Sequence, residues 1–334
     1  MAKVLILSSD VSPKLDVWKH SSAFLLKHSA ELDTFGMHTL TDDPAEADII
    51  LFAEMGTCGK FAEMVRAHPY YRRYSRKCFL FDSADFFFLV APGIYASLTK
   101  QQYRPDYTRT GFYLYLIENA FITSQPCTGS EKYLASFVGS RNTHPVRDHV
   151  FTFGRDDIYA KDTSNYSSRT TYHGEPEERA RFWLEYAEVL ADSKFSLCPR
   201  GQGAGTIRLY ESMKMGRACV ILADDWQPHG QIPWEEFSIK VAEQDVQRLP
   251  EILEQHQHRV VEMGARARQV WEEYFSEKVR FHRVVELCLD IQRNRTNNPR
   301  VTLQLLRQLR SVSNLRWYLS SKKDLYRNTG KIYW

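Results

Sequence analysis

The sequence lacks the features that mark several classes of protein. It has 16 glycines and 13 prolines among 334 residues, while Phe, Tyr and Trp together make up 13%, a composition that excludes a mainly disordered chain. No run approaches the roughly 18 apolar residues that a transmembrane helix requires. The six cysteines include no Cys-x-x-Cys pair, so neither a zinc ribbon nor a thioredoxin-type motif is expected.

An excess of one charge is also absent. The 44 basic and 41 acidic residues leave a formal net charge of +3, which is too balanced to predict a nucleic-acid partner. The apolar run at residues 4–7 is too short for the core of a signal peptide. Scattered single cysteines are typical of reduced thiols in the cytosol. We therefore expect a cytoplasmic protein.

Strands and helices are expected to alternate along the chain. Those of the first half are strands at 4–7, 47–52 and 78–81 and a helix at 17–29. Those of the second half are a strand ending near 140, helices at 177–191 and 206–215, and strands at 194–198 and 218–223. Such alternation predicts βαβ units and a parallel sheet, and the length predicts about two domains.

Two further segments have a less regular pattern. The polar stretch 154–176 has little periodicity and is expected to form loops. The tail from about 301 is expected to be helical and basic, with Arg307, Arg310, Arg316, Lys322 and Lys323. We expect one face of this helix to pack on the body of the protein. Docking on an acidic membrane surface is the alternative.

The most informative stretch reads as strand, glycine loop and helix. Gly201, Gly203 and Gly205 follow the strand and are expected to bring the backbone close to a ligand, with positive φ. The loop opens onto the helix that starts at Thr206, where unpaired amides favour an anion. Arg200 stands at the loop entry.

Arg208 and Glu211 lie three residues apart and therefore share one helix face. Two arginines and a carboxylate suit a nucleoside diphosphate, the arginines for the phosphates and the carboxylate for the ribose. The spacing matches neither the GxxxxGK[ST] loop nor the GxGxxG fingerprint. A structural glycine turn with an ion pair on the helix surface is the alternative.

This region resembles the exostosin-type glycosyltransferases. The resemblance lies in Leu-Cys-Pro-Arg-Gly from Leu197, Arg-Leu-Tyr-Glu from Arg208 and Met-Gly-Arg-Ala from Met215. The Phe-Val-Gly-Ser-Arg run from Phe137, and the Trp-x-x-Phe-Ser run from Trp234, are also similar to the family. The match spans about residues 135–260 and weakens over residues 81–88.

The resemblance implies a GT-B architecture of two Rossmann-like domains that face each other across a cleft. An acceptor domain is expected at 1–134 and a donor domain at 135–300, with the tail 301–334 packing back on the first. The implied activity is inverting transfer of a sugar from a nucleotide sugar, commonly a UDP-sugar, to a glycan or other acceptor. Gly139 and Arg147 match the phosphate-side loop.

Inverting transfer requires stabilisation of the leaving diphosphate and a base for the acceptor hydroxyl. The chain has no Asp-x-Asp metal motif, so we assign the first task to the arginines and helix amides, with no metal and no cofactor. Asp85 and Asp82 are the candidate bases. Other candidates are Asp10, Glu54 and His20.

Aromatic residues follow the motif at Trp226, Trp234 and Phe237. They suit either stacking on a base or sugar, or packing between domains. A non-catalytic nucleotide- or glycan-binding protein on the same scaffold is the alternative to an enzyme.

Overall fold

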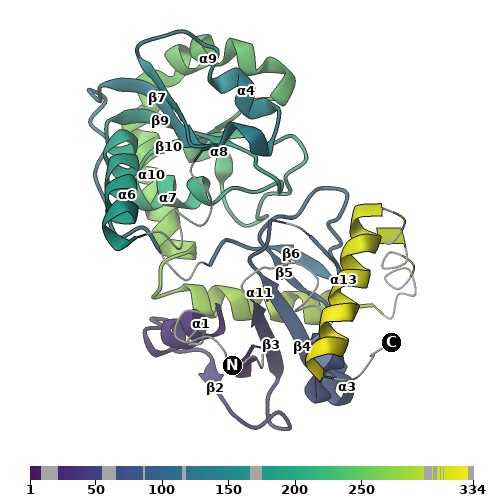
Figure 1. Ribbon diagram of the computed structural model, residues 1–334. Helices are drawn as coiled ribbons and strands as arrows, with labels where there is room; N and C mark the ends of the chain where they lie inside the picture. Colours follow the sequence, from purple (N-terminus) through teal and green to yellow (C-terminus); the bar gives the residue numbers. More distant parts are fainter. Residues whose placement is uncertain are drawn as a thin grey trace. The chain divides into compact units, whose positions relative to one another are not determined.

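The computed structural model describes residues 1–8, 22–54, 65–85, 87–114, 118–165, 175–296, 303, 307–308, 310 and 312–329. The chain forms two compact units (Figure 1). Unit 1 consists of Met1–Leu116 together with Glu277–Trp334, and unit 2 is Ile117–Ser276. Each unit contains one parallel β-sheet.

The sheet of unit 1 has the strand order β2-β1-β3-β4-β5-β6, and every neighbouring pair is parallel. Its strands are β1 (Lys3–Leu7), β2 (Thr39–Leu40), β3 (Ile49–Glu54), β4 (Cys78–Asp82), β5 (Gly93–Tyr95) and β6 (Thr108–Thr110). The unit's helices are α1 (Ser22–Glu31), α3 (Pro69–Tyr74), α11 (Arg280–Asn294), α13 (Val312–Thr329) and the short 3₁₀ helix η2 (Ser75–Lys77). The central strands β1, β3 and β4 are apolar except at their terminal residues, and their apolar residues are almost all buried, which is typical of a parallel sheet covered on both faces.

The sheet of unit 2 has the order β11-β10-β9-β7-β8 and is also parallel. Its strands are β7 (Tyr133–Gly139), β8 (Ile158–Asp162), β9 (Ser193–Pro199), β10 (Ala218–Leu222) and β11 (Ser238–Lys240). The helices are α4 (Val146–Val150), α6 (Pro176–Ala191), α7 (Ile207–Met215), α8 (Trp234–Phe237), α9 (Leu249–His256) and α10 (Val260–Tyr274), with 3₁₀ helices η3 (Arg141–Thr143), η4 (Glu243–Arg248) and η5 (Gln257–Arg259). Phe137, Phe195 and Leu197 are fully buried in its core.

Two parallel sheets, one in each compact unit, confirm the predicted α/β class with two Rossmann-like units. One prediction was wrong, because β8 lies inside the stretch 154–176 that was expected to form loops. In this edge strand only Ile158 is buried. The sequence therefore has no apolar run that would predict a strand here. The predicted helix at 17–29 is described only from Ser22, and Asp10 and His20 lie outside the described residues.

The units divide at Leu116 and at Ser276, whereas boundaries at 134 and 300 were expected. The cause of the second difference is α11, which packs on α1, β3, β5 and β6 of the first sheet. Its apolar face includes Phe281, Val285 and Ile291, each at most 2% exposed. The amphipathic pattern indicates that α11 is buried on one side, but not against which sheet.

No described helix is long and apolar enough to cross a membrane. The five described cysteines (Cys78, Cys127, Cys198, Cys219 and Cys288) are buried free thiols, as expected.

The residues from 277 onward all belong to unit 1. In addition, the Leu89 backbone N–H donates to the Gln308 side-chain oxygen at 3.0 Å.

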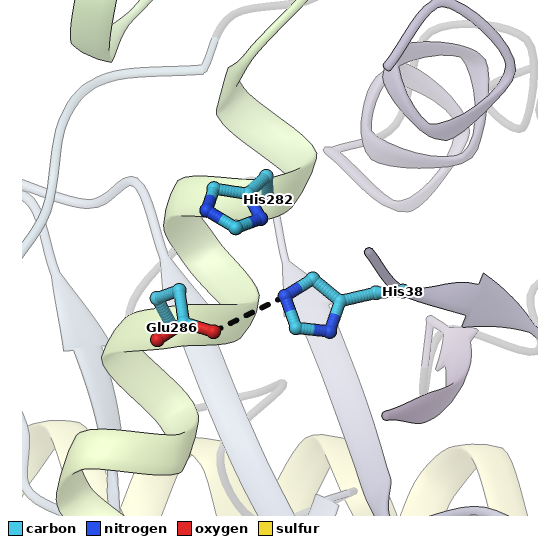
Figure 2. Close-up of side chains that lie close together, drawn as sticks. All are labelled: His38, His282 and Glu286. Atoms are coloured by element: carbon cyan, nitrogen blue, oxygen red, sulfur yellow. Dashed lines mark ion pairs between the residues drawn. The ribbon is translucent and has the colours of Figure 1, made fainter. Parts of the chain in front are cut away.

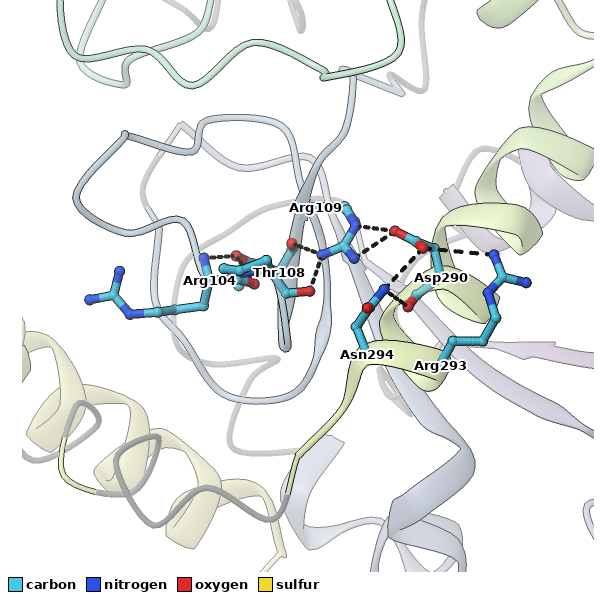
Figure 3. Close-up of polar contacts among 7 residues, drawn as sticks. Arg104, Thr108, Arg109, Asp290, Arg293 and Asn294 are labelled. Atoms are coloured by element: carbon cyan, nitrogen blue, oxygen red, sulfur yellow. Dashed lines mark hydrogen bonds and ion pairs between the residues drawn. The ribbon is translucent and has the colours of Figure 1, made fainter.

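A buried arginine joins α11 to the last strand of the first sheet (Figure 3). Nε and Nη2 of Arg109 donate to one Asp290 oxygen at 2.8 and 2.6 Å. Nη1 donates to the Pro105 and Thr108 carbonyls at 2.6 and 2.7 Å. The Arg109 side chain is 11% exposed, so each of its hydrogen-bonding groups needs these partners.

We expect Arg109→Ala to lower the free energy of unfolding by about 2–4 kcal/mol, because it leaves carbonyls and a carboxylate without their charged donor. Arg293→Ala is the matched control. Arg293 lies 3.7 Å from the same Asp290, but it is 63% exposed, and exposed pairs contribute at most about 1 kcal/mol. Urea unfolding of both variants measures the difference, and equal losses would contradict this account.

Candidate functional site

The glycine loop lies at the carboxyl edge of the second sheet. It begins where β9 ends at Pro199, and α7 begins at Ile207. Thr206 is the N-cap of α7, but its side chain makes no capping hydrogen bond. The first amides of α7 therefore have no side-chain cap to accept from them. After α7, Gly216 ends the helix with φ 93° and the chain enters β10.

Arg200 stands at the entry of this loop, as the sequence indicated. Its backbone N–H donates to the Leu222 carbonyl at 3.0 Å, which holds the loop start beside the end of β10. The Arg200 Nη1 lies 3.6 Å from an Asp225 oxygen and 3.9 Å from a Glu243 oxygen. At these distances the Arg200 guanidinium lies near two carboxylates but forms a close ion pair with neither of them.

Arg208 and Glu211 are brought together with a residue that the sequence did not indicate. The Arg208 guanidinium lies over the Phe137 ring at 4.5 Å and the Tyr186 ring at 5.6 Å, and its Nη2 donates to the Val138 carbonyl. The Tyr186 hydroxyl donates to Glu211 Oε2 at 2.8 Å. Burial raises the pKa of Glu211, and the hydrogen bond from Tyr186 and the Arg208 charge oppose that rise.

The guanidinium of Arg147 holds the backbone at the start of the glycine loop. Its Nε donates to the Arg200 carbonyl at 2.8 Å, Nη1 to the Ser140 carbonyl at 2.9 Å and Nη2 to the Pro199 carbonyl at 3.3 Å. The residue is 8% exposed. These contacts join the ends of β7 and β9, so Arg147 positions the backbone of the site.

The glycines have different roles from the one expected. Gly201 does not have positive φ, but a Cβ there would lie 3.1 Å from Nη2 of Arg147. A Cβ on Gly139 would lie 2.9 Å from the Phe137 ring and 3.0 Å from Nη2 of Arg208. At both positions an added Cβ would have to displace a neighbouring side chain. Gly203 and Gly205 are buried in the loop.

Several polar atoms at this edge are buried without a hydrogen bond among the described residues. They include Nε of Arg200, Nε of Arg208 and Oγ1 of Thr143. Two of these are cationic donors, and the third is a hydroxyl. Buried polar groups are nearly always hydrogen-bonded, so these atoms lack the partners that such groups normally have.

His144 adds a titratable group beside the arginines. Burial is the largest cause that lowers the pKa of its imidazole, and the positive charges of Arg200 and Arg147 lower it further. The ring is therefore neutral at pH 7, and its Nδ1 accepts from the Val146 backbone N–H at 3.3 Å.

The aromatic residues after β10 pack on each other. The ring of Trp234 lies 5.0 Å from that of Trp226 and 5.3 Å from that of Phe237. All three are at most 9% exposed, and the Trp234 indole donates to the His229 carbonyl at 3.0 Å. These rings therefore pack on each other within unit 2, whereas the alternative expected from the sequence was packing between domains.

Arg217 of the Met-Gly-Arg-Ala run has a structural role. It is 2% exposed, and it donates to four backbone carbonyls, those of Gln125, Leu190, Ala191 and Gly216. It joins the end of α6 to the segment before β7. No signal in the sequence separates this arginine from Arg200 or Arg208, because burial decides the difference.

The candidate bases lie at the carboxyl edge of the first sheet. Asp82 ends β4 directly opposite Glu54 of β3, and its Oδ1 accepts from the Ala84 N–H at 2.9 Å. Asp85 is exposed, and its Oδ1 accepts from the Tyr113 hydroxyl at 2.9 Å. The sequence order of strand and carboxylate therefore brings Asp82 to the expected edge.

We expect Gly139→Ala to destabilise the protein by about 1–3 kcal/mol, since overpacking displaces Arg208 from the Phe137 ring. Gly230→Ala is the control, because a Cβ on Gly230 meets nothing within 4 Å. Thermal unfolding measures both. A Gly139→Ala protein as stable as the control would show that Arg208 is not held against the backbone of β7.

Comparison with known proteins agrees with the resemblance found in the sequence. Residues 122–256 match the family model described as the Exostosin GT47 domain. The Exostosin-1 homolog of Caenorhabditis elegans is 31% identical over 156 residues, which cover 43% of this chain and 41% of that protein. The probable glucuronoxylan glucuronosyltransferase IRX7 of Arabidopsis thaliana is 35% identical over 121 residues, or 31% of this chain and 26% of that protein.

The chain thus spans less than half the length of these relatives. The prediction of an exostosin-type relationship is confirmed by the match to the GT47 family model, which spans residues 122–256 and includes the glycine loop, Arg200 and Arg208.

Two solved structures are also similar in part. MurG of Acinetobacter baumannii matches with a TM-score of 0.40 and 11% identity, over 86% of this chain and 99% of that one. Anabaena HepE in complex with UDP-glucose matches with a TM-score of 0.42 and 11% identity, over 88% of this chain and 99% of that one. Scores at this level do not decide the ligand.

Proposed function

We propose that the protein is a glycosyltransferase that moves a sugar from a nucleotide sugar to a hydroxyl acceptor. The observation that carries the proposal is the pair Arg200 and Arg208, with buried Nε atoms that lack partners among the described residues, beside the uncapped start of α7. This arrangement supports a nucleoside diphosphate as ligand. The relationship to named glycosyltransferases supports the reaction class.

The proposed chemistry follows from the charges at the two sheet edges. The leaving diphosphate gains negative charge as the bond to the sugar breaks, and fixed guanidinium groups and helix amides stabilise that charge. We propose that transfer needs no metal or other cofactor. Glu211 lies one turn from Arg208 and is partly exposed, which suits contact with the ribose hydroxyls.

An inverting reaction needs one base for the acceptor hydroxyl. We propose Asp85 or Asp82 for this task, because both follow β4 at the carboxyl edge, where α/β sheets bind their ligands. We further propose a UDP-sugar as donor and a glycan as acceptor. The second candidate is a nucleotide- or glycan-binding protein without catalytic activity. This candidate is favoured if neither Asp85 nor Asp82 acts as a base.

Donor binding tests the site. We expect Arg208→Ala and Glu211→Ala each to weaken the affinity for UDP about tenfold or more, because a hydrogen bond to a charged group contributes about 1.5–3 kcal/mol. Arg248→Ala, an exposed arginine in the same unit, is the control and should bind normally. Isothermal titration calorimetry gives the affinities, and normal binding by both site variants would remove this assignment.

Turnover separates the enzyme from a binding protein. We expect the wild-type chain to release UDP from a UDP-sugar when a panel of glycan acceptors is supplied. Asp85→Asn or Asp82→Asn should lower that release about 10²-fold or more, since general bases contribute about 10²–10⁴-fold, while UDP affinity stays unchanged. Normal binding with no release for any donor and acceptor would favour the second candidate.

A further inference from the structure

A second group of unpartnered buried polar atoms lies in unit 1, away from the carboxyl edge. His282 and Glu286 are one turn apart on α11, and His38 reaches toward them from the segment before β2 (Figure 2). The ligand atoms of the three side chains all lie within 4.8 Å of one another. The proposed donor site and the candidate bases include none of these three residues.

The two imidazoles are buried with unsatisfied nitrogens. The His38 side chain is 1% exposed and its Nε2 pairs with Glu286 Oε1 at 3.2 Å, whereas its Nδ1 is buried without a hydrogen bond among the described residues. Nδ1 of His282 is likewise buried without a partner. Burying a polar group without a hydrogen bond is unfavourable, so this place indicates a missing ligand that accepts nitrogen lone pairs.

The surrounding residues hold the imidazoles in position. Gly36 has φ 60°, and its N–H donates to Asp33 Oδ2 at 2.9 Å, which forms the turn before His38. The Phe35 ring stacks on His282 with centroids 3.9 Å apart. Oδ1 of Asp33 is also buried without a partner and adds negative charge near both histidines.

The donor set suits a zinc-class ion, and the ligand atoms of the three side chains lie within 4.8 Å of one another. Two imidazoles and one carboxylate are ligands of Zn²⁺, with bonds of about 2.0–2.2 Å, so tetrahedral ligand atoms lie ~3.4 Å apart. His38 Nε2 and Glu286 Oε1 are 3.2 Å apart. Burial lowers the pKa of both imidazoles, and the neutral ring is the form that binds a metal.

We propose that His38, His282 and Glu286 bind one divalent transition-metal ion of the zinc class. Three protein ligands leave a coordination position for water. The site has a structural role, because His38 directly precedes β2, whose first residue pairs with the first residue of β1. It therefore lies at the amino ends of the strands, opposite the edge where Asp82 lies, and it joins α11 to that end of the sheet.

Zinc titration of the full-length protein, stripped with EDTA, tests the proposal. We expect one Zn²⁺ per chain by isothermal titration calorimetry, and a rise in Tm of about 5 °C at a hundredfold excess over Kd. Co²⁺ at the same site should give the visible absorption of a tetrahedral ion. Failure of the wild-type protein to bind zinc stoichiometrically would overturn the proposal.

Variants locate the ion. His38→Ala, His282→Ala and Glu286→Gln should each weaken zinc binding by at least about tenfold. His28→Ala is the matched control, because His28 and Glu31 form a similar pair at 3.1 Å on an exposed surface, and it should bind zinc normally. If a histidine variant fails to fold by circular dichroism, Glu286→Gln decides, since Glu286 is 39% exposed. Unchanged affinity in Glu286→Gln would then refute the site.

Discussion

The candidate site depends on guanidinium groups buried among backbone carbonyls at the end of a parallel sheet. Parallel strands bring their carboxyl ends to one edge, where the last carbonyls have no strand partner. Arg147 donates to carbonyls after β7 and β9 at this edge. With the carbonyls satisfied in this way, the loop between β9 and α7 holds Arg200 and Arg208 beside the helix amides.

The arginines of this unit therefore divide by what surrounds them. Arg147 and Arg217 direct their guanidinium nitrogens to carbonyls, and both are at most 8% exposed. Arg200 and Arg208 each keep an Nε that is buried without a partner among the described residues. Unsatisfied cationic donors favour an anionic ligand, so the same residue type supports the scaffold at two positions and, in the proposed function, the ligand at two others.

The two units place their polar chemistry differently. In the described part of unit 2 the buried atoms without a hydrogen bond include Nε of Arg200 and Nε of Arg208, two cationic donors at the carboxyl edge. In the described part of unit 1 they include imidazole nitrogens of His38 and His282 and a carboxylate oxygen of Asp33 near the amino ends of the strands, where a cation suits them. The opposite chemical character of the two groups argues for two separate ligands, an anion at one site and a metal ion at the other.

The sequence by itself determined the α/β class, the strand, loop and helix around Gly201, and the exostosin-type relationship. These depend on local periodicity, on glycine spacing and on residues adjacent in the chain. Only the tertiary structure decided that α11 belongs to the first sheet, that Tyr186 hydrogen-bonds Glu211, that Arg147 supports the loop, and that His38 meets His282. Each of these contacts joins residues far apart in the chain, and an amphipathic pattern shows which face of an element is buried without showing the partner that covers it.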